Sequence, residues 1–174
     1  MNITFDQPEL WTDAACESVW TAALITGLAV KRYAVLSSEV SFDAVFAPTP
    51  ITCRFTSTLD TESSCLYGII RYRDIRKVGI AITVHELGHH LNVRAKLLPE
   101  KQVMKDRITL KAGSLWGGMH TPGMAEGEQP DEIFANLFAD WCLGMLNHNK
   151  AGDKLRAWMD GNMPAWVAAA MESK

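Results

Sequence analysis

The sequence has no apolar stretch long enough to cross a membrane, no closely paired cysteines and no excess of positive charge. Its longest mostly apolar stretch, residues 19–30, is shorter than the roughly 20 residues that a membrane helix needs. The first ten residues, MNITFDQPEL, include Asp6 and Glu9 but no basic side chain, so we expect no signal peptide. The formal net charge of −3 lacks the basic excess typical of nucleic-acid-binding domains. We therefore expect a cytoplasmic protein that contacts neither a membrane nor nucleic acid directly.

The cysteines are few and scattered, without a C-x-x-C pair. This spacing does not resemble that of paired zinc-binding thiolates. We interpret all four as small apolar residues of a reduced protein. The alternative is a disulfide between Cys53 and Cys65, formed across a hairpin. The four positions are Cys16, Cys53, Cys65 and Cys142.

The chain of 174 residues, 48% of them hydrophobic, is long enough for one domain with a sizeable core, and we expect residues 1–174 to form that single domain. Helical spacing of apolar residues predicts a helix over residues 11–30, with Thr12 or Asp13 as its N-cap. Residues 33–72 change character and predict two to four strands of a small, mostly local sheet. The clearest segments are ITCRFTSTL (51–59) and CLYGIIRYR (65–73), separated by a polar turn at residues 60–64.

Helical spacing returns in the second half of the chain and predicts an α+β fold. One helix is expected over residues 74–95, and another from Pro130 to about residue 146. Between them lies a loop rich in Gly and Met, residues 111–129, which is long enough to suggest a functional role. Residues 154–159 and 164–171 predict two short closing helices.

The nonapeptide VHELGHHLN (84–92) contains the motif H-E-x-x-H. On a helix, His89 lies only about 40° around the axis from His85, so both imidazoles can bind one ion while Glu86 stays beside them. The opposite face is apolar and is predicted to pack on the core; it consists of Val84, Leu87, Leu91 and Ala95. The motif therefore predicts a metal site, with Zn²⁺ as the ion and Glu86 as the catalytic base.

Two other residues of this helix receive different interpretations. His90 points away from the histidine pair, and we expect it at the surface or as an outer partner of a metal ligand. Gly88 borders the apolar face and would let another element pack closely.

A catalytic zinc usually has three protein ligands, so a third is needed. We favour Glu132, because it lies on a predicted helix that is apolar nearly all round. Asn136 and Asp140 follow it at four-residue intervals, and either could orient a histidine N–H. The competing candidates are His120, Glu126, Glu128 and Asp131.

HELGHHL followed by E-x-x-A-N-x-F-A at residues 132–139 resembles the ImmA/IrrE-type zinc peptidases, over roughly residues 65–146. The resemblance implies a compact zincin-like domain, in which a small sheet packs against the H-E-x-x-H helix and a second helix carries the last ligand. It implies His85, His89 and Glu132 as the ligands of Zn²⁺. This chain departs from the family pattern at Phe134, where a second Glu is often found, and in the long interval between the two motifs.

The function predicted from these residues is hydrolysis of a peptide bond in a protein or peptide substrate, in a bacterial or phage setting. The water that attacks would be bound to zinc and activated by Glu86. His120, Tyr67 and Tyr72 are candidates for stabilising the oxyanion, and a strand near residues 66–73 could pair with the substrate. One alternative is a non-catalytic module that binds a protein through the 111–129 loop. Another keeps the enzyme but takes His120 as the third ligand.

Overall fold

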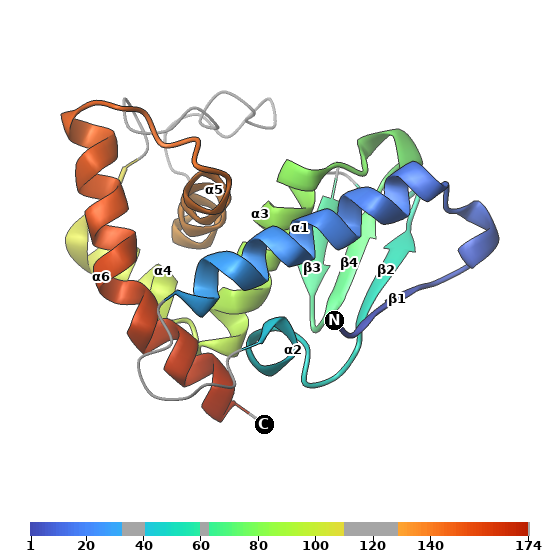
Figure 1. Ribbon diagram of the computed structural model, residues 1–174, viewed down its shortest axis with the longest axis horizontal. Coiled ribbons are helices and arrows are strands. Elements are labelled where there is room, and N and C mark those ends of the chain that lie inside the picture. Colours follow the sequence, from blue (N-terminus) through green and yellow to red (C-terminus); the bar gives the residue numbers. More distant parts are fainter. Residues whose placement is uncertain (33–40, 60–62, 110–128, 174) are drawn as a thin grey trace.

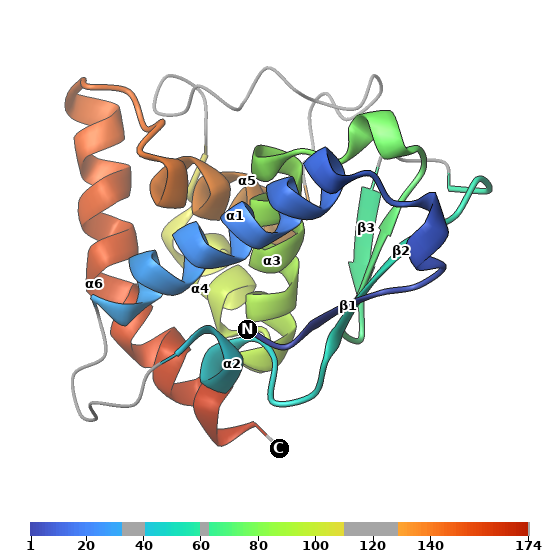
Figure 2. The same cartoon turned by 45° about the vertical axis from the view of Figure 1, so that its right-hand side comes forward.

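The computed structural model describes residues 1–32, 41–59, 63–109 and 129–173. These residues form six α-helices and a four-stranded sheet, which confirms the predicted α+β class (Figure 1). The strands are β1 (Ile3–Phe5), β2 (Ile51–Phe55), β3 (Ser63–Leu66) and β4 (Ile69–Tyr72). The helices are α1 (Asp13–Lys31), α2 (Phe42–Val45), α3 (Ile80–Arg94), α4 (Leu98–Asp106), α5 (Pro130–Leu143) and α6 (Lys150–Glu172), with 3₁₀ turns at Pro8–Leu10 and Ile75–Lys77. The sheet lies at one end and α4, α5 and α6 at the other, while α1 runs across both (Figures 1 and 2).

The sheet has the order β1-β2-β4-β3, so that β3 is an edge strand. β1, β2 and β4 are parallel, whereas β3 runs antiparallel to β4. The predicted segment 51–59 contains β2, and segment 65–73 divides into the end of β3 and β4, joined by a tight turn at Tyr67 and Gly68. Both turn residues have positive φ, 49° and 77°, which Gly68 adopts without steric cost. The β1 strand was not predicted, and it makes the sheet less local than expected.

Cys53 and Cys65 lie on opposite sides of the central strand β4, because each is registered with Ile70. Two strand spacings separate them by about 9.5 Å, beyond the roughly 7 Å between Cα atoms that a disulfide can bridge. All four cysteines are free, so the alternative Cys53–Cys65 disulfide is not formed; Cys53 is buried and the other three are partly buried.

Helix α1 agrees with prediction, whereas α2, α4 and α6 differ from it. α1 has Thr12 as its N-cap, with the side chain accepting a hydrogen bond from the Ala15 amide, as expected. Residues 42–45, expected among the strands, instead form the short helix α2, capped by Ser41. α4 was not predicted. The two predicted closing helices are one helix, α6, which continues through Pro164. A proline inside a helix costs about 3 kcal/mol, and here the buried face of α6 offsets that cost; it includes Met159, Met163, Trp166 and Val167.

α3 lies at the centre of the molecule, where it packs against α1, α5, α6 and β3. Its predicted core face is fully buried: Val84, Leu87, Leu91 and Ala95 are at most 1% exposed. Burying each of the larger side chains stabilises the fold by roughly 1.5–3 kcal/mol. One continuous hydrophobic cluster joins this face to the sheet and to α1, α5 and α6.

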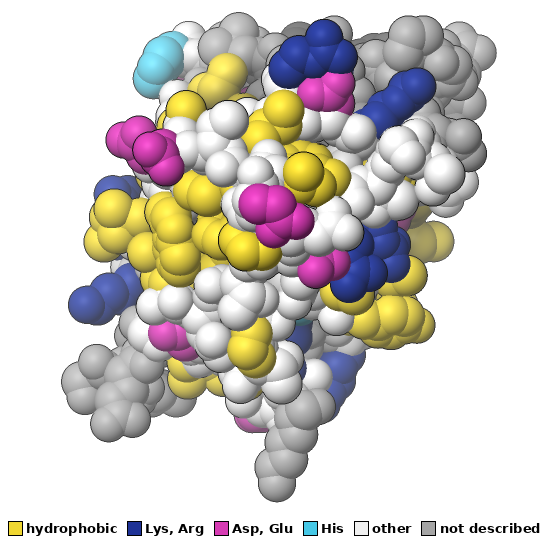
Figure 3. Space-filling view, turned by 90° about the vertical axis from the view of Figure 1, so that its right-hand side faces the viewer, with side chains coloured by type: hydrophobic (Ala, Val, Ile, Leu, Met, Phe, Trp, Pro, Cys, Tyr) yellow, Lys and Arg dark blue, Asp and Glu magenta, His cyan; other side chains and the backbone are white. Residues whose placement is uncertain are grey.

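Of the helices in the described part of the chain, none is long and apolar enough to cross a membrane. Figure 3 shows the end of the molecule that carries the sheet, where acidic and basic side chains are interspersed with hydrophobic ones.

Candidate metal centre

His85 and His89 converge from one face of α3, as their spacing predicts. Their Nε2 atoms are 3.1 Å apart, and the two rings meet edge to face with centroids 4.8 Å apart. The side chains are 14% and 15% exposed, so both are mostly buried but still reach solvent. Two neutral imidazole nitrogens this close compete for one proton or share one cation.

Glu132 reaches the histidine pair from α5. Its Oε2 lies 3.4 Å from His85 Nε2, and its Oε1 lies 3.3 Å from His89 Nε2. The close packing of α5 on α3 makes this reach possible, because Gly88 has no side chain to separate the helices. A Cβ built at Gly88 would lie 3.0 Å from Ala135 Cα and 3.1 Å from Phe138 Cδ1. The predicted role of Gly88 is therefore confirmed.

The His85, His89 and Glu132 side chains have the spacing of a metal-binding set. One donor atom from each lies within 4.8 Å of the others. Around a tetrahedral Zn²⁺ with bonds of about 2.0–2.2 Å, neighbouring ligand atoms are about 3.3–3.5 Å apart. The two Nε2 atoms are 3.1 Å apart, and each lies 3.3–3.4 Å from a different oxygen of the Glu132 carboxylate, which is close to the separation of neighbouring ligand atoms around such an ion. Two imidazoles and a carboxylate are also a donor set that zinc accepts.

Glu86 lies beside the three candidate ligands but faces the sheet. It is 2% exposed, and its Oε1 accepts a hydrogen bond of 2.6 Å from Ser63 Oγ on β3. Its Oε2 is buried and has no hydrogen-bond partner among the described residues. Burial raises the pKa of the Glu86 carboxyl, against the lowering effect of the nearby histidines and Ser63. A buried carboxylate with one free oxygen is suited to accept a proton.

The electrostatics of the site favour a cation between the helices. Hydrogen bonds from His85 and His89 hold the pKa of Glu132 well below its ordinary value. Burial lowers the pKa of His89, but the hydrogen bond to Glu132 and the charges of Glu86, Glu132 and Asp131 outweigh it, so that this pKa is raised. Glu86 and Glu132 thus bring two negative charges into a largely buried space, where a divalent ion would offset both.

The outer partners of the histidines differ from prediction. His85 Nδ1 is buried and has no hydrogen-bond partner in the described ranges, so neither Asn136 nor Asp140 orients it. Both residues are buried on α5, as their position in an apolar helix predicts. Asp131, which sequence reasoning treated only as a rival ligand, places its Oδ2 4.0 Å from His89 Nδ1.

His90 is neither at the surface nor a partner of the pair, so its prediction is wrong. It is 8% exposed, and its Nε2 bonds the backbone carbonyl of Phe46. Burial lowers the pKa of His90, so it is held as a neutral donor. The helical spacing gave the direction of His90 correctly, but the carbonyl of Phe46, the residue that ends α2, lies against that side of the helix.

The remaining candidates for the oxyanion donor and for the third metal ligand have different positions. The Tyr72 hydroxyl is buried and pairs with Thr83 Oγ1 at 2.8 Å, which removes it as a donor to an oxyanion. Tyr67 is 83% exposed in the turn between β3 and β4. His120, Glu126 and Glu128 lie outside the described residues, as does most of the predicted 111–129 loop. Ser63 was missed because the sequence predicts residues 60–64 as a polar turn, whereas Ser63 and Ser64 begin the strand β3.

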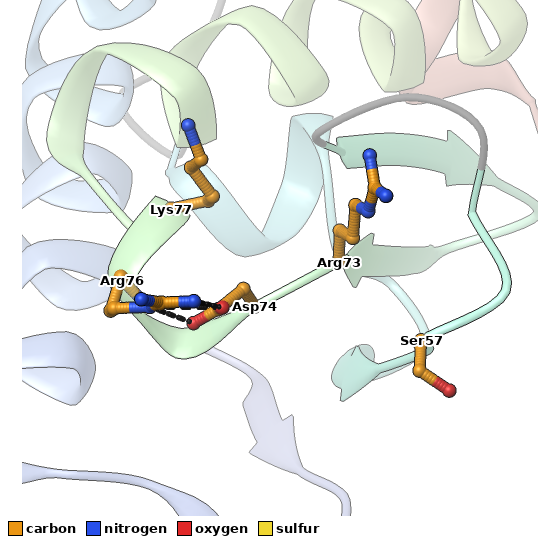
Figure 4. A pocket seen from close by; sticks show the side chains of 5 residues that line it. All are labelled: Ser57, Arg73, Asp74, Arg76 and Lys77. Atoms are coloured by element: carbon orange, nitrogen blue, oxygen red, sulfur yellow. Dashed lines mark hydrogen bonds and ion pairs between the residues drawn. The ribbon is translucent and has the colours of Figure 1, made fainter.

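A separate hollow of about 470 Å³ lies beyond the end of β4 (Figure 4). Arg76 folds onto the carboxylate of Asp74 there, so part of its charge is neutralised within the hollow (Figure 4). None of the four predicted site residues lines this hollow; its lining residues are Ser57, Arg73, Asp74, Arg76 and Lys77.

Comparison of the chain with protein-family models, with curated proteins and with solved structures finds no match. The resemblance to ImmA/IrrE-type peptidases is therefore one of two short motifs.

Proposed function

We propose that this protein is a zinc-dependent peptidase. The observation that carries the proposal is the convergence of His85, His89 and Glu132, from each of which one donor atom lies within 4.8 Å of the others. These three side chains would hold Zn²⁺, and three protein ligands leave a coordination position for a water or a substrate. Glu86, beside the ligands but not among them, supports a hydrolytic rather than a purely structural site.

The chemistry divides between the ion and the chain. Zn²⁺, when bound, would lower the pKa of a coordinated water toward about 7 and polarise the carbonyl of a peptide bond. Glu86 Oε2 would accept the proton of the attacking water, because Ser63 already occupies Oε1. The same oxygen would then deliver the proton to the leaving amine. Burial raises the pKa of Glu86, which makes its carboxylate a stronger base for this exchange.

The edge strand β3 supports an extended peptide as the substrate. β4 is flanked by β2 and β3, so among the described strands the edges of the sheet are β1 and β3, and the edge near the motif helix is β3 rather than the wider segment 66–73. β3 also packs against α3, which brings this edge beside the motif helix. Peptides commonly bind by adding a strand to such an edge, with main-chain hydrogen bonds providing the affinity.

The decisive experiment compares wild type with Glu86→Gln, each with zinc content measured. Both are incubated with a library of peptides made from a bacterial proteome, and new N-termini are identified by mass spectrometry. We expect equal zinc in the two proteins and cleavage by wild type alone. The Gln side chain keeps the shape but cannot accept the proton, so the rate should fall by a factor of at least about 100. Chelation should stop cleavage, and added zinc should restore it.

Two results would overturn the proposal. The first is a wild-type protein that binds no stoichiometric zinc under conditions in which it is folded. The second is a fully zinc-loaded wild type that cuts neither the library nor protein partners captured by Glu86→Gln. The second result would favour the non-catalytic binding module.

A further inference from the structure

Two neighbouring strands hold α3 at positions one turn apart. Ser63 on β3 and Tyr72 on β4 are direct cross-strand partners, so their side chains lie on the same face of the sheet. Ser63 Oγ donates to Glu86 Oε1 at 2.6 Å, and the Tyr72 hydroxyl pairs with Thr83 Oγ1 at 2.8 Å. Residues 83 and 86 are neighbours on one helix face. The sheet and the motif helix are thus joined by two side-chain hydrogen bonds in matching register.

The two bonds have different surroundings. The Tyr72–Thr83 bond is fully buried, and Thr83 Oγ1 also bonds the Gly79 carbonyl, which ties it to the start of α3. The Ser63–Glu86 bond lies at the edge of the sheet and ends on the Glu86 carboxylate, one residue after the candidate ligand His85. One bond therefore fixes where the helix begins, and the other fixes the direction of a single functional side chain.

We propose that Ser63 is a positioning residue for Glu86, an inference that rests on the proposed peptidase function. The Ser63 hydroxyl holds Oε1, which leaves Oε2 as the only carboxylate oxygen of Glu86 without a partner among the described residues. Fixing one oxygen also fixes the side-chain rotation that places the other. Because Ser63 opens the edge strand, the residue that orients the base belongs to the strand on which an extended substrate would pair.

The first test measures kcat and KM separately for Ser63→Ala on a fluorogenic peptide built from a cleavage site found with the library. We expect kcat to fall about 10–100-fold, as for a misplaced catalytic group. KM and zinc content should change little, and Ser63→Thr should restore most of kcat because it keeps the hydroxyl. The matched control is Ser64→Ala, the adjacent serine on the opposite face, registered with Arg71. An unchanged kcat in Ser63→Ala, or an equal loss in Ser64→Ala, would overturn the role of Ser63.

The second test needs neither metal nor activity. A double-mutant cycle combines Ser63→Ala with Glu86→Ala, and urea unfolding of the metal-free proteins gives the folding equilibrium constants. We expect Ser63→Ala to lower this constant about 10-fold or more when Glu86 is present, since the bond ends on a charged group. With Ala at position 86 the loss should shrink to about 3-fold or less. Equal losses in the two backgrounds would show that Ser63 and Glu86 are not coupled. If wild type hydrolyses nothing, the peptidase proposal fails, while this cycle still decides whether the pair is coupled.

Discussion

Gly88 on α3 lies directly against Ala135 on α5, close enough that a Cβ on the glycine would stand 3.0 Å from Ala135 Cα. At this point the two helices meet backbone to backbone. His89, adjacent to Gly88 on α3, and Glu132, one turn before Ala135 on α5, flank the contact. The distance between these candidate metal ligands therefore depends on the absence of a side chain at position 88.

Gly88→Ala should separate the helices. An added methyl group in a well-packed contact typically costs about 1–3 kcal/mol, and the better helix propensity of Ala returns only about 1 kcal/mol of that. We expect a lower melting temperature and at least about tenfold weaker zinc binding, because Glu132 moves away from the histidines. The matched control is Gly161→Ala in α6, where nothing lies within 4 Å of the new Cβ. Calorimetry should show that this control is at least as stable as wild type.

Glu132 should be the third ligand of the metal. When the free zinc concentration is 100 times the dissociation constant, binding raises the free energy of unfolding by about 2.7 kcal/mol. Thermal unfolding with and without zinc therefore reports the binding. Glu132→Gln should lose most of this increase, whereas Asp131→Asn, which alters only an outer contact, should weaken binding about tenfold. His85→Ala and His89→Ala should abolish stoichiometric zinc. If His120→Ala lost all zinc binding while Glu132→Gln bound zinc as wild type does, the result would instead support the three-histidine alternative.

His90 should make the fold sensitive to acid. Burial lowers its pKa in the folded protein below the ordinary value of about 6.5, so the unfolded chain takes up this proton first as the pH falls. Above the unfolded pKa, His90 is neutral in both states and does not destabilise the fold. As the pH drops below that value, the free energy of unfolding declines. Urea unfolding of the metal-free protein between pH 8 and 5 should show a shallower decline for His90→Gln than for wild type. His148→Gln, at an exposed position, should keep the wild-type dependence.

The cysteines should be protected rather than bonded. Burial raises the pKa of Cys53 to about 12, and it also raises those of Cys65 and Cys142. Because the thiolate is the reactive form, these thiols should react slowly with a disulfide reagent near neutral pH in the native protein. The unfolded chain should titrate four thiols. A count of two in unfolded protein purified without oxidant would contradict the free thiols of the structure.

The motif helix could be predicted well because its evidence is local. A period of 3.6 residues determines which side chains share a face, so the buried stripe through Leu87, the convergence of the two histidines and the small contact at Gly88 all follow from the spacing. Glu132 could be predicted for the same reason, since a charged residue in an otherwise apolar helix needs a partner. In the structure, one donor atom from each of His85, His89 and Glu132 lies within 4.8 Å of the others.

The errors concern features that distant segments decide. β1 has only three residues, and it is a strand because β2 supplies its hydrogen bonds. Nothing near His90 in the sequence indicates that Phe46 covers it. Pro164 is an ordinary signal for the end of a helix, yet the burial of both halves of α6 keeps the helix continuous. Ser63 depends on the register of β3 with β4, which the sequence does not determine.

The division of the three candidate ligands between α3 and α5 also sets an order in time. α3 is synthesised before α5, and its histidine pair alone would leave half of a tetrahedral coordination shell to water. Tight binding must therefore wait until α5 docks at Gly88 and brings Glu132 into place. From then on a bound ion would act as a clip between two segments far apart in the chain, and it would stabilise the docked helix against local opening. Acquisition of the metal and completion of the helical core would then be the same event.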